Sequence, residues 1–292
     1  MRDLRKTGGW PVAFAPARNT SGTTTSSRAA AGRPPTAVRP VSRGRLAGFR
    51  VAAILTGLLL LLAGAPALLA PWWLPADTGD AHAEAHRWFI TVSGTADTIG
   101  AIALLVLAFR PALVLLAVET LVAVVLAALI NMPVDPWFGV IVLIMTPMLV
   151  LYPHWPRVRD VRTWWATPIK PPLLLGLAST TVLVGIGTVA IARQFTAEDS
   201  AAAANWWSDY AEHLVLLGVV LLFAATRLPG WRVLAAAASA GWIYLGLTAT
   251  LLLPNQTASW GTPYGLFGVL LGAATATTLS SKDNEPRTRQ CS

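Results

Sequence analysis

Apolar runs of membrane-spanning length recur along this 292-residue chain from about residue 48 onwards. Each run is close to the roughly 20 residues that an α-helix needs to cross a hydrocarbon core of about 30 Å. Because lipid offers no partners for backbone N–H and C=O groups, runs of this length fold as helices that pair those groups internally. We therefore predict eight helices, of which the fourth and the eighth are short. Their approximate ranges are 48–70, 88–109, 112–131, 137–152, 172–192, 207–226, 233–253 and 264–280.

The composition is typical of a polytopic membrane protein. Hydrophobic residues make up 54% of the chain and charged residues only 12%, whereas a soluble domain carries about 25% charged residues. The sequence thus predicts an all-α bundle of transmembrane helices. The formal net charge of +8 does not indicate nucleic-acid binding, because the positive residues gather in the first fifty positions and in the short loops. That distribution is typical of residues that anchor helices to anionic lipid.

The N-terminal segment, residues 1–46, is rich in Arg, Pro, Ser, Thr and Ala and contains one acid, Asp3. Such a segment buries too little apolar surface to offset its ordering entropy, so we predict a disordered basic tail. In the cytoplasm, its arginines Arg43 and Arg45 would bind anionic lipids. The Ala- and Arg-rich usage is typical of bacteria with GC-rich genomes and favours a bacterial plasma membrane. The N-terminal segment also resembles a mitochondrial transit peptide in composition, which leaves the mitochondrial inner membrane as the alternative location.

The positive charges also predict the orientation of the helices. With the N-terminus in the cytoplasm, only Arg87 and Arg193 fall on the outer side. This asymmetry favours an even number of spans, with both the N-terminus and the C-terminal tail at 282–292 in the cytoplasm. The loop and tail residues expected on the cytoplasmic side are Arg110, Arg157, Arg159, Arg162, Lys170, Arg227, Arg232, Lys282, Arg287 and Arg289.

The chain has features of an internal duplication. Trp88 opens the second apolar run and Pro111 follows it, while Trp206 opens the sixth run and Pro229 follows at the same separation. Four runs in each part that start on the same side would give two parallel four-helix repeats, related by an axis along the membrane normal. The alternative is that hairpins bounded by Trp and Pro recur without a duplication. The expected boundaries are 47–152 for the first half, 153–171 for a cytoplasmic linker and 172–281 for the second half.

Two acids lie well inside apolar runs. Asp97 and Glu119 belong to the second and third helices, which a short turn joins, and they differ in depth by about five residues, or roughly 7 Å. Ser93, Thr95 and Thr98 supply hydroxyl groups near Asp97. Ionisable groups at such depth are costly and mark ion or proton pathways in many membrane proteins. The alternative is that each carboxyl is a hydrogen-bonding contact that holds neighbouring helices together.

Histidines and further acids lie at the predicted outer ends of the helices. His82 and His86 are four residues apart before the second helix, and His213 follows Asp209 by four residues in the sixth. Imidazoles with this spacing share a helical face and can bind a transition metal, with Glu212 or Asp209 completing the shell, or two histidines can ligate a haem. The spacing is not that of a known zinc motif. The alternative is that these residues decorate the membrane interface.

The candidate functions follow from what the chain lacks as well as from these groups. No predicted loop exceeds about twenty residues, which leaves no room for a soluble catalytic domain, and Cys291 is the single cysteine. The sequence therefore favours a protein without catalytic activity over an enzyme. The first candidate is a permeation protein for a small solute, ion or proton, with an outward-facing vestibule between the second and sixth helices. The second is a metal- or haem-binding redox or assembly component, and the third is a scaffold subunit without chemistry of its own.

Overall fold

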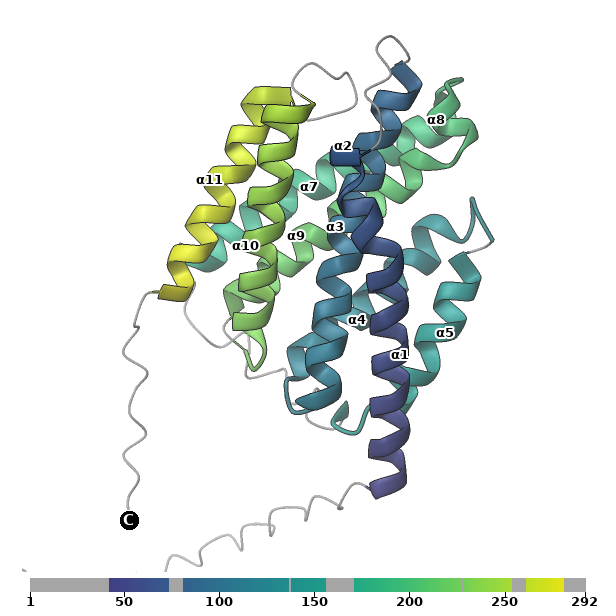
Figure 1. Ribbon diagram of the computed structural model, residues 1–292, viewed down its shortest axis with the longest axis vertical. Helices are drawn as coiled ribbons and strands as arrows, with labels where there is room; N and C mark the ends of the chain where they lie inside the picture. The colour runs from purple at the N-terminus through teal and green to yellow at the C-terminus, as the bar shows by residue number, and fades with distance from the viewer. Residues whose placement is uncertain are drawn as a thin grey trace, which may run out of the picture. The chain divides into compact units, whose positions relative to one another are not determined.

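The computed structural model describes residues 42–73, 81–136, 138–155, 171–226, 228–253 and 261–280. Every regular element within these ranges is a helix (Figure 1), so the predicted all-α fold is confirmed. The helices are α1 (Arg43–Leu68), α2 (Ala70–Trp73), α3 (Ala81–Phe109), α4 (Val114–Leu126) with the π-helical turn η1 (Ala127–Asn131), α5 (Phe138–Leu151), α7 (Pro171–Thr196), α8 (Ser200–Ala203), α9 (Trp206–Thr226), α10 (Trp231–Leu247) with the π-helical turn η3 (Thr248–Leu252), and α11 (Gly261–Ser280).

Among the described residues, six helices are long and apolar enough to cross a membrane. They run over Arg43–Leu68, His86–Phe109, Val114–Asn131, Leu173–Thr196, Trp206–Thr226 and Trp231–Leu252. Shorter apolar helices, Phe138–Leu151 and Pro263–Thr277, occupy the positions of the fourth and eighth predicted runs. The protein is therefore a multi-pass helical membrane protein.

Two helices begin earlier than their apolar runs. α1 starts at Arg43, where the side chain of Ser42 caps the helix by accepting a hydrogen bond from the backbone N–H of Arg45. The end of the predicted disordered tail is thus helical. α3 starts at Ala81 instead of Trp88, because the residues before Trp88 include alanine, glutamate and arginine, which favour helix in spite of their polarity.

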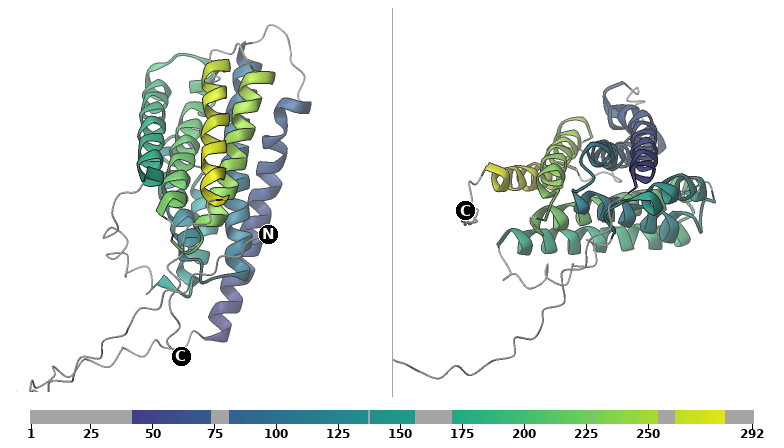
Figure 2. Two further views of the ribbon diagram at one scale, coloured as in Figure 1. Left: turned by 90° about the vertical axis from the view of Figure 1, so that its left-hand side faces the viewer. Right: turned by 90° about the horizontal axis from the view of Figure 1, so that it is seen from below.

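The bundle is organised around α3 and α9, which contact each other. α1 packs along α3, α7 packs along α9, and α10 contacts both central helices. α4 bridges α3 and α9, and α5 packs against α1 and α4. α11 lies side by side with α10 (Figure 2). α3 and α9 thus form the centre of the bundle, and the other helices pack around them.

Aromatic packing fixes the register between the two central helices. The ring of Phe89 on α3 lies 6.0, 5.0 and 5.0 Å from the rings of Trp206, Trp207 and Tyr210 at the start of α9. Phe89 is fully buried. Residues at four-residue intervals share a helical face, so the polar residues one and two turns beyond Phe89 face the polar residues of α9.

A close crossing presses α1 against the middle of α3. A Cβ atom at Gly94 would lie 2.3 Å from the backbone nitrogen of Leu68, and one at Gly64 would lie 2.8 Å from the Cβ of Asp97. Helices in a membrane approach this closely only where small residues meet. The crossing therefore holds α1 directly beside Asp97.

The turns at the other end of the bundle are tied together. The backbone N–H of Leu115, after the α3–α4 turn, donates to the carbonyl oxygen of Pro229 in the α9–α10 turn at 3.2 Å. Gly230, next in that turn, has a φ of 109°, a conformation that glycine adopts without steric cost. The α3–α4 hairpin and the α9–α10 hairpin thus contact each other through their turns.

The guanidinium group of Arg45 ties the start of α1 to the end of α5. Its nitrogens donate to the carbonyl oxygens of Val150, Leu151 and Tyr152 at 3.0, 3.1 and 3.2 Å. Carbonyl groups at a helix end lack partners within the helix, and a positive charge there is favourable. Arg45, which the sequence predicts to contact lipid, caps α5 in the structure.

Candidate functional site

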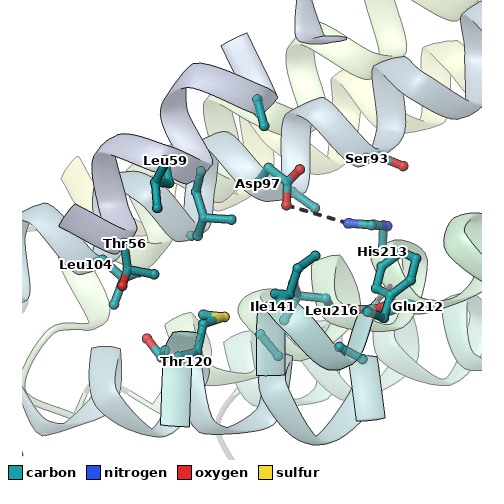
Figure 3. Close-up of a pocket in the computed structure, with 18 of the residues that line it drawn as sticks. Thr56, Leu59, Ser93, Asp97, Leu104, Thr120, Ile141, Glu212, His213 and Leu216 are labelled. Carbon is teal, nitrogen blue, oxygen red and sulfur yellow. Dashed lines mark ion pairs between the residues drawn. The ribbon is translucent and has the colours of Figure 1, made fainter. Parts of the chain in front are cut away.

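A cavity of about 430 Å³ lies between α1, α3, α4, α5 and α9. Figure 3 shows Ser93 and Asp97 from α3 and Glu212 and His213 from α9 gathered on one side of it, with Leu59, Leu104, Thr56 and Thr120 on the other. Five titratable residues line it, and none of the described lining residues is Lys or Arg. The titratable residues are Asp97, Glu119, Asp209, Glu212 and His213.

The imidazole of His213 lies between two carboxyl groups. Its Nε2 atom is 3.7 Å from Oδ1 of Asp97 on α3 (Figure 3), and its Nδ1 atom is 3.2 Å from Oδ1 of Asp209, four residues earlier on α9. Nδ1 is also 2.7 Å from the backbone carbonyl oxygen of Asp209. His213 is buried, whereas the carboxyl groups of Asp97 and Asp209 are 32% and 28% exposed. The two acids therefore face the open cavity and the histidine lies behind them.

These contacts determine where a proton must lie. A carbonyl oxygen only accepts hydrogen bonds, so Nδ1 of His213 carries a hydrogen. Nε2 lies 3.7 Å from Oδ1 of Asp97, which is an ion-pair distance and too long for a direct hydrogen bond.

Ser93 links the central helices beside this group. Its hydroxyl group donates to Oδ2 of Asp209 at 2.5 Å. The sequence placed Ser93 near Asp97, since the two residues share a face of α3, but the hydroxyl group serves the acid of the neighbouring helix. Asp209 therefore accepts hydrogen bonds from two helices, and its orientation toward His213 is fixed.

Glu212 is paired with a residue that sequence reasoning did not assign to the site. The side-chain amide of Asn131 donates to Oε2 of Glu212, and Asn131 is fully buried. Asn131 ends the π-helical turn η1, a type of irregularity that is frequent at functional sites. The position of an amide at the end of an apolar run was the signal that the sequence offered.

Glu119 lies on α4, 1% exposed, and lines the same cavity as Asp97. Its Oε2 atom has no hydrogen-bond partner among the described residues. Thr120 beside it also lines the cavity, and its hydroxyl group donates to the carbonyl of Leu116 at 2.9 Å. Glu119 is thus a buried acid with one oxygen available to a ligand.

Two of the predicted hydroxyl residues lie outside the cavity wall. Thr95 donates to the backbone carbonyl of Thr91 at 2.7 Å, and Thr98 lies against α1 near Gly64. Neither is among the lining residues. Both residues belong to the surface through which α3 packs against its neighbours.

The structure separates two of the predicted histidine ligands, His86 and His213. The ring of His86 stacks on Trp206, with centroids 4.3 Å apart, whereas His213 faces Asp97, eleven residues or about 16 Å further along α3. The side chain of His82 lies outside the described residues. In the described part of the chain, no group of three or more His, Cys, Asp or Glu residues is arranged to hold a metal ion.

A second cavity, of about 860 Å³, lies between α7, α9, α10 and α11. Its described lining is almost entirely apolar, with Arg193 as the charged residue at one end. Arg193 lies over the ring of Trp207, 4.9 Å from its centroid. Of these two cavities, the one beside α1, α4 and α5 is the one with acidic side chains in its described lining.

No family model, curated protein or solved structure matches this chain. Fold and cavity together define its class, which is a multi-pass helical membrane protein with an acidic cavity among its helices.

Proposed function

We propose that this protein is a membrane permeation protein that carries protons or a small cation through the cavity of about 430 Å³. The observation that supports this function is the group of four acids and one histidine lining a cavity among helices of spanning length. An acidic or basic side chain at the centre of a membrane helix costs about 2.5–3.5 kcal/mol on insertion scales. Such groups are expected where a pathway needs them, because apolar residues would serve packing at lower cost.

The acids lie at different depths, as a pathway requires. At 1.5 Å per residue, Asp209 is roughly 5 Å from the start of α9 at Trp206, and Asp97 is roughly 18 Å from the end of α3 at Phe109. Glu119 is roughly 8 Å from the start of α4. We assign the exchange of protons with the outer side to His213 and the acids beside it, and exchange with the inner side to Glu119.

The proposal includes eight spans with both termini in the cytoplasm. α5 and α11 would complete the count as short or tilted spans, since each lies where an apolar run was predicted. The distribution of Lys and Arg supports this orientation. Arg193 and Arg87 would then lie near the outer surface, together with the aromatic cluster around Phe89.

We also infer two parallel repeats, consisting of α1 to α5 and α7 to α11. Three features support the duplication: the first helix of each half packs along the second, the third helix of each half ends in a π-helical turn, and the two central turns contact each other. The halves differ in their last helix, because α11 packs on α10 whereas α5 packs on α1 and α4. The acidic cavity lies beside α5 and has residues of both halves in its lining.

The location and the lipid partner are further proposals. The basic segment at 1–46, most of which lies outside the described residues, would bind anionic lipids on the cytoplasmic face of a bacterial plasma membrane. Liposome flotation of the full chain with and without anionic lipid tests the lipid contact, and removal of residues 1–41 should weaken it.

Flux measurements on the full chain in proteoliposomes test the proposed function. A pH-sensitive dye inside the vesicles reports proton entry under an imposed potential, with and without Na⁺ outside. We expect the double variant Asp97→Asn, Glu119→Gln to lose most of the flux. Glu198→Gln, the same chemical change at an exposed loop position, should retain it. Equal flux in the double variant and the unchanged protein would refute a role for these carboxyls.

The same preparation tests the redox alternative. A Soret band, or a stoichiometric metal that is lost on His213→Ala, would assign the protein to metal or haem chemistry instead of permeation. A protein with no flux, no metal and no chromophore would be a scaffold subunit.

A further inference from the structure

The charge of the cavity is unevenly compensated. The three acids near α9 have partners in His213, Ser93 or Asn131. Oε2 of Glu119, by contrast, is buried without a hydrogen-bond partner among the described residues. An ionised carboxylate in an apolar setting is strongly unfavourable unless it is paired. Glu119 therefore requires either a proton or a positively charged ligand in the cavity.

The wall contributed by α1 and α5 is apolar apart from the hydroxyl group of Thr56. Aliphatic and aromatic side chains from these two helices form the rest of it, without a charged group among the described lining residues. A ligand that fills a cavity of about 430 Å³ would contact this wall as well as the acids, and cavities of about 300–1,000 Å³ hold organic molecules of moderate size. The apolar side chains of this wall include those of Leu59, Leu60, Phe138, Ile141 and Ile144.

Part of the apolar wall is exposed. Leu59 on α1 and Ile144 on α5 are 53% and 44% exposed, whereas Glu119 is 1% exposed. The acid therefore lies deeper in the bundle than these apolar residues.

We propose that the cavity binds an organic ammonium ion with a hydrocarbon body, with the positive charge at Glu119 and the body against α1 and α5. This inference rests on the proposed function and specifies its substrate. Binding is an exchange: the cation enters as Glu119 releases its proton to solvent, so the carboxyl group becomes a carboxylate paired with the ammonium ion and the cavity keeps the same net charge.

Other ligand classes fit the cavity less well. An anion would face up to four carboxylates with no Lys or Arg in the described lining to balance it. A site-bound metal ion needs several ligands at one point, and the described residues provide no such group. A small inorganic cation would leave the apolar wall without contacts.

Calorimetric titration of the purified full chain with benzyltrimethylammonium tests the proposal. This probe carries a permanent positive charge and an apolar ring. Tetramethylammonium, which lacks the ring, and phenylacetate, which carries the opposite charge, are the matched controls. Repeating the titration in buffers with different ionisation enthalpies counts the protons released.

We expect benzyltrimethylammonium to bind at least about tenfold more tightly than tetramethylammonium, to release about one proton, and phenylacetate not to bind. Glu119→Gln should weaken binding at least about tenfold, because it removes one partner of a buried charge pair, and should abolish the proton release. Glu119→Asp, which keeps the charge, should retain part of the affinity and the proton release. Glu198→Gln should bind like the unchanged protein.

The outcomes separate this inference from the proposed function. If benzyltrimethylammonium does not bind while proton or Na⁺ flux depends on Asp97, the substrate class is wrong and the permeation role stands. Equal binding of tetramethylammonium, or binding unaffected by Glu119→Gln, would also overturn the assignment. If flux is independent of the carboxyls but the probe binds through Glu119, the site is correct and the permeation role is not.

Discussion

His213 of α9 and Asp97 of α3 face each other across the contact between the two central helices, with Nε2 and Oδ1 3.7 Å apart. The pair lies on the wall of the acidic cavity, so one contact both joins the helices and forms part of the site. Loss of either side chain should therefore affect stability as well as flux.

A double-mutant cycle measures that pair. Because Asp97→Asn and His213→Gln each remove the same contact, we expect their effects on the free energy of unfolding to be non-additive by about 0.5–3 kcal/mol. SDS titration of the protein in mild detergent gives the four values. The cycle of Glu198→Gln with His213→Gln, in which the residues share no contact, should be additive. Additivity in the first cycle as well would show that the pair does not interact.

The hydroxyl group of Ser93 should stabilise the contact between α3 and α9. Ser93→Ala leaves Asp209 without its donor from α3, and a hydrogen bond to an ionised group contributes about 1.5–3 kcal/mol. Thr188→Ala is the control, since that hydroxyl group is exposed and bonds only its own helix at Val184. Thermal unfolding in detergent should show a clear loss for Ser93→Ala and a small one for the control. Equal losses would contradict the assigned contact.

The buried pair of Asn131 and Glu212 makes a prediction about pH. In Asn131→Asp, two carboxyl groups face each other, and like charges this close do not both ionise in the folded state. The folded variant then holds a proton that the unfolded chain releases, so its stability relative to the unchanged protein should fall as the pH rises. Melting temperatures at several pH values between about 5 and 8 give the comparison. A constant difference across that range would argue against the pairing.

The crossing of α1 and α3 should tolerate no side chain at Gly94. A Cβ there would lie 2.3 Å from the backbone of Leu68, so Gly94→Ala forces the helices apart, at an expected cost of about 1–3 kcal/mol for overpacking. At Gly185 on α7, a Cβ would meet no atom within 4 Å. Gly185→Ala should be neutral or stabilising by up to about 1 kcal/mol, because alanine favours helix over glycine. Unfolding measurements in detergent should show opposite behaviour at the two glycines.

The existence and type of the helices were predictable because an apolar run of about 20 residues has few folded solutions in lipid. The ends of the helices were less predictable. The polar segment before Trp88 forms the start of α3, because the helix propensity of its residues does not depend on hydrophobicity. The short turn between α3 and α4 indicated that Asp97 and Glu119 belong to neighbouring helices. The structure places both on one cavity, and a functional role for either stays a prediction.

Partners across helices were beyond sequence reasoning. Helical spacing relates Ser93 to Asp97, but the hydroxyl group bonds Asp209 on another helix, and no pattern within α3 specifies which face of α9 it meets. Asn131 was missed as a site residue because neither the π-helical turn that it ends nor its partner on α9 can be read from the apolar run. The position of α5 against α1 depends on packing between segments about ninety residues apart, which periodicity does not report.

The cap that Arg45 places on α5 means that the segment from α1 to α5 begins and ends at the same point. Both ends of the segment from Ser42 to Trp155 are thus held by one side chain, and its loss would release them together.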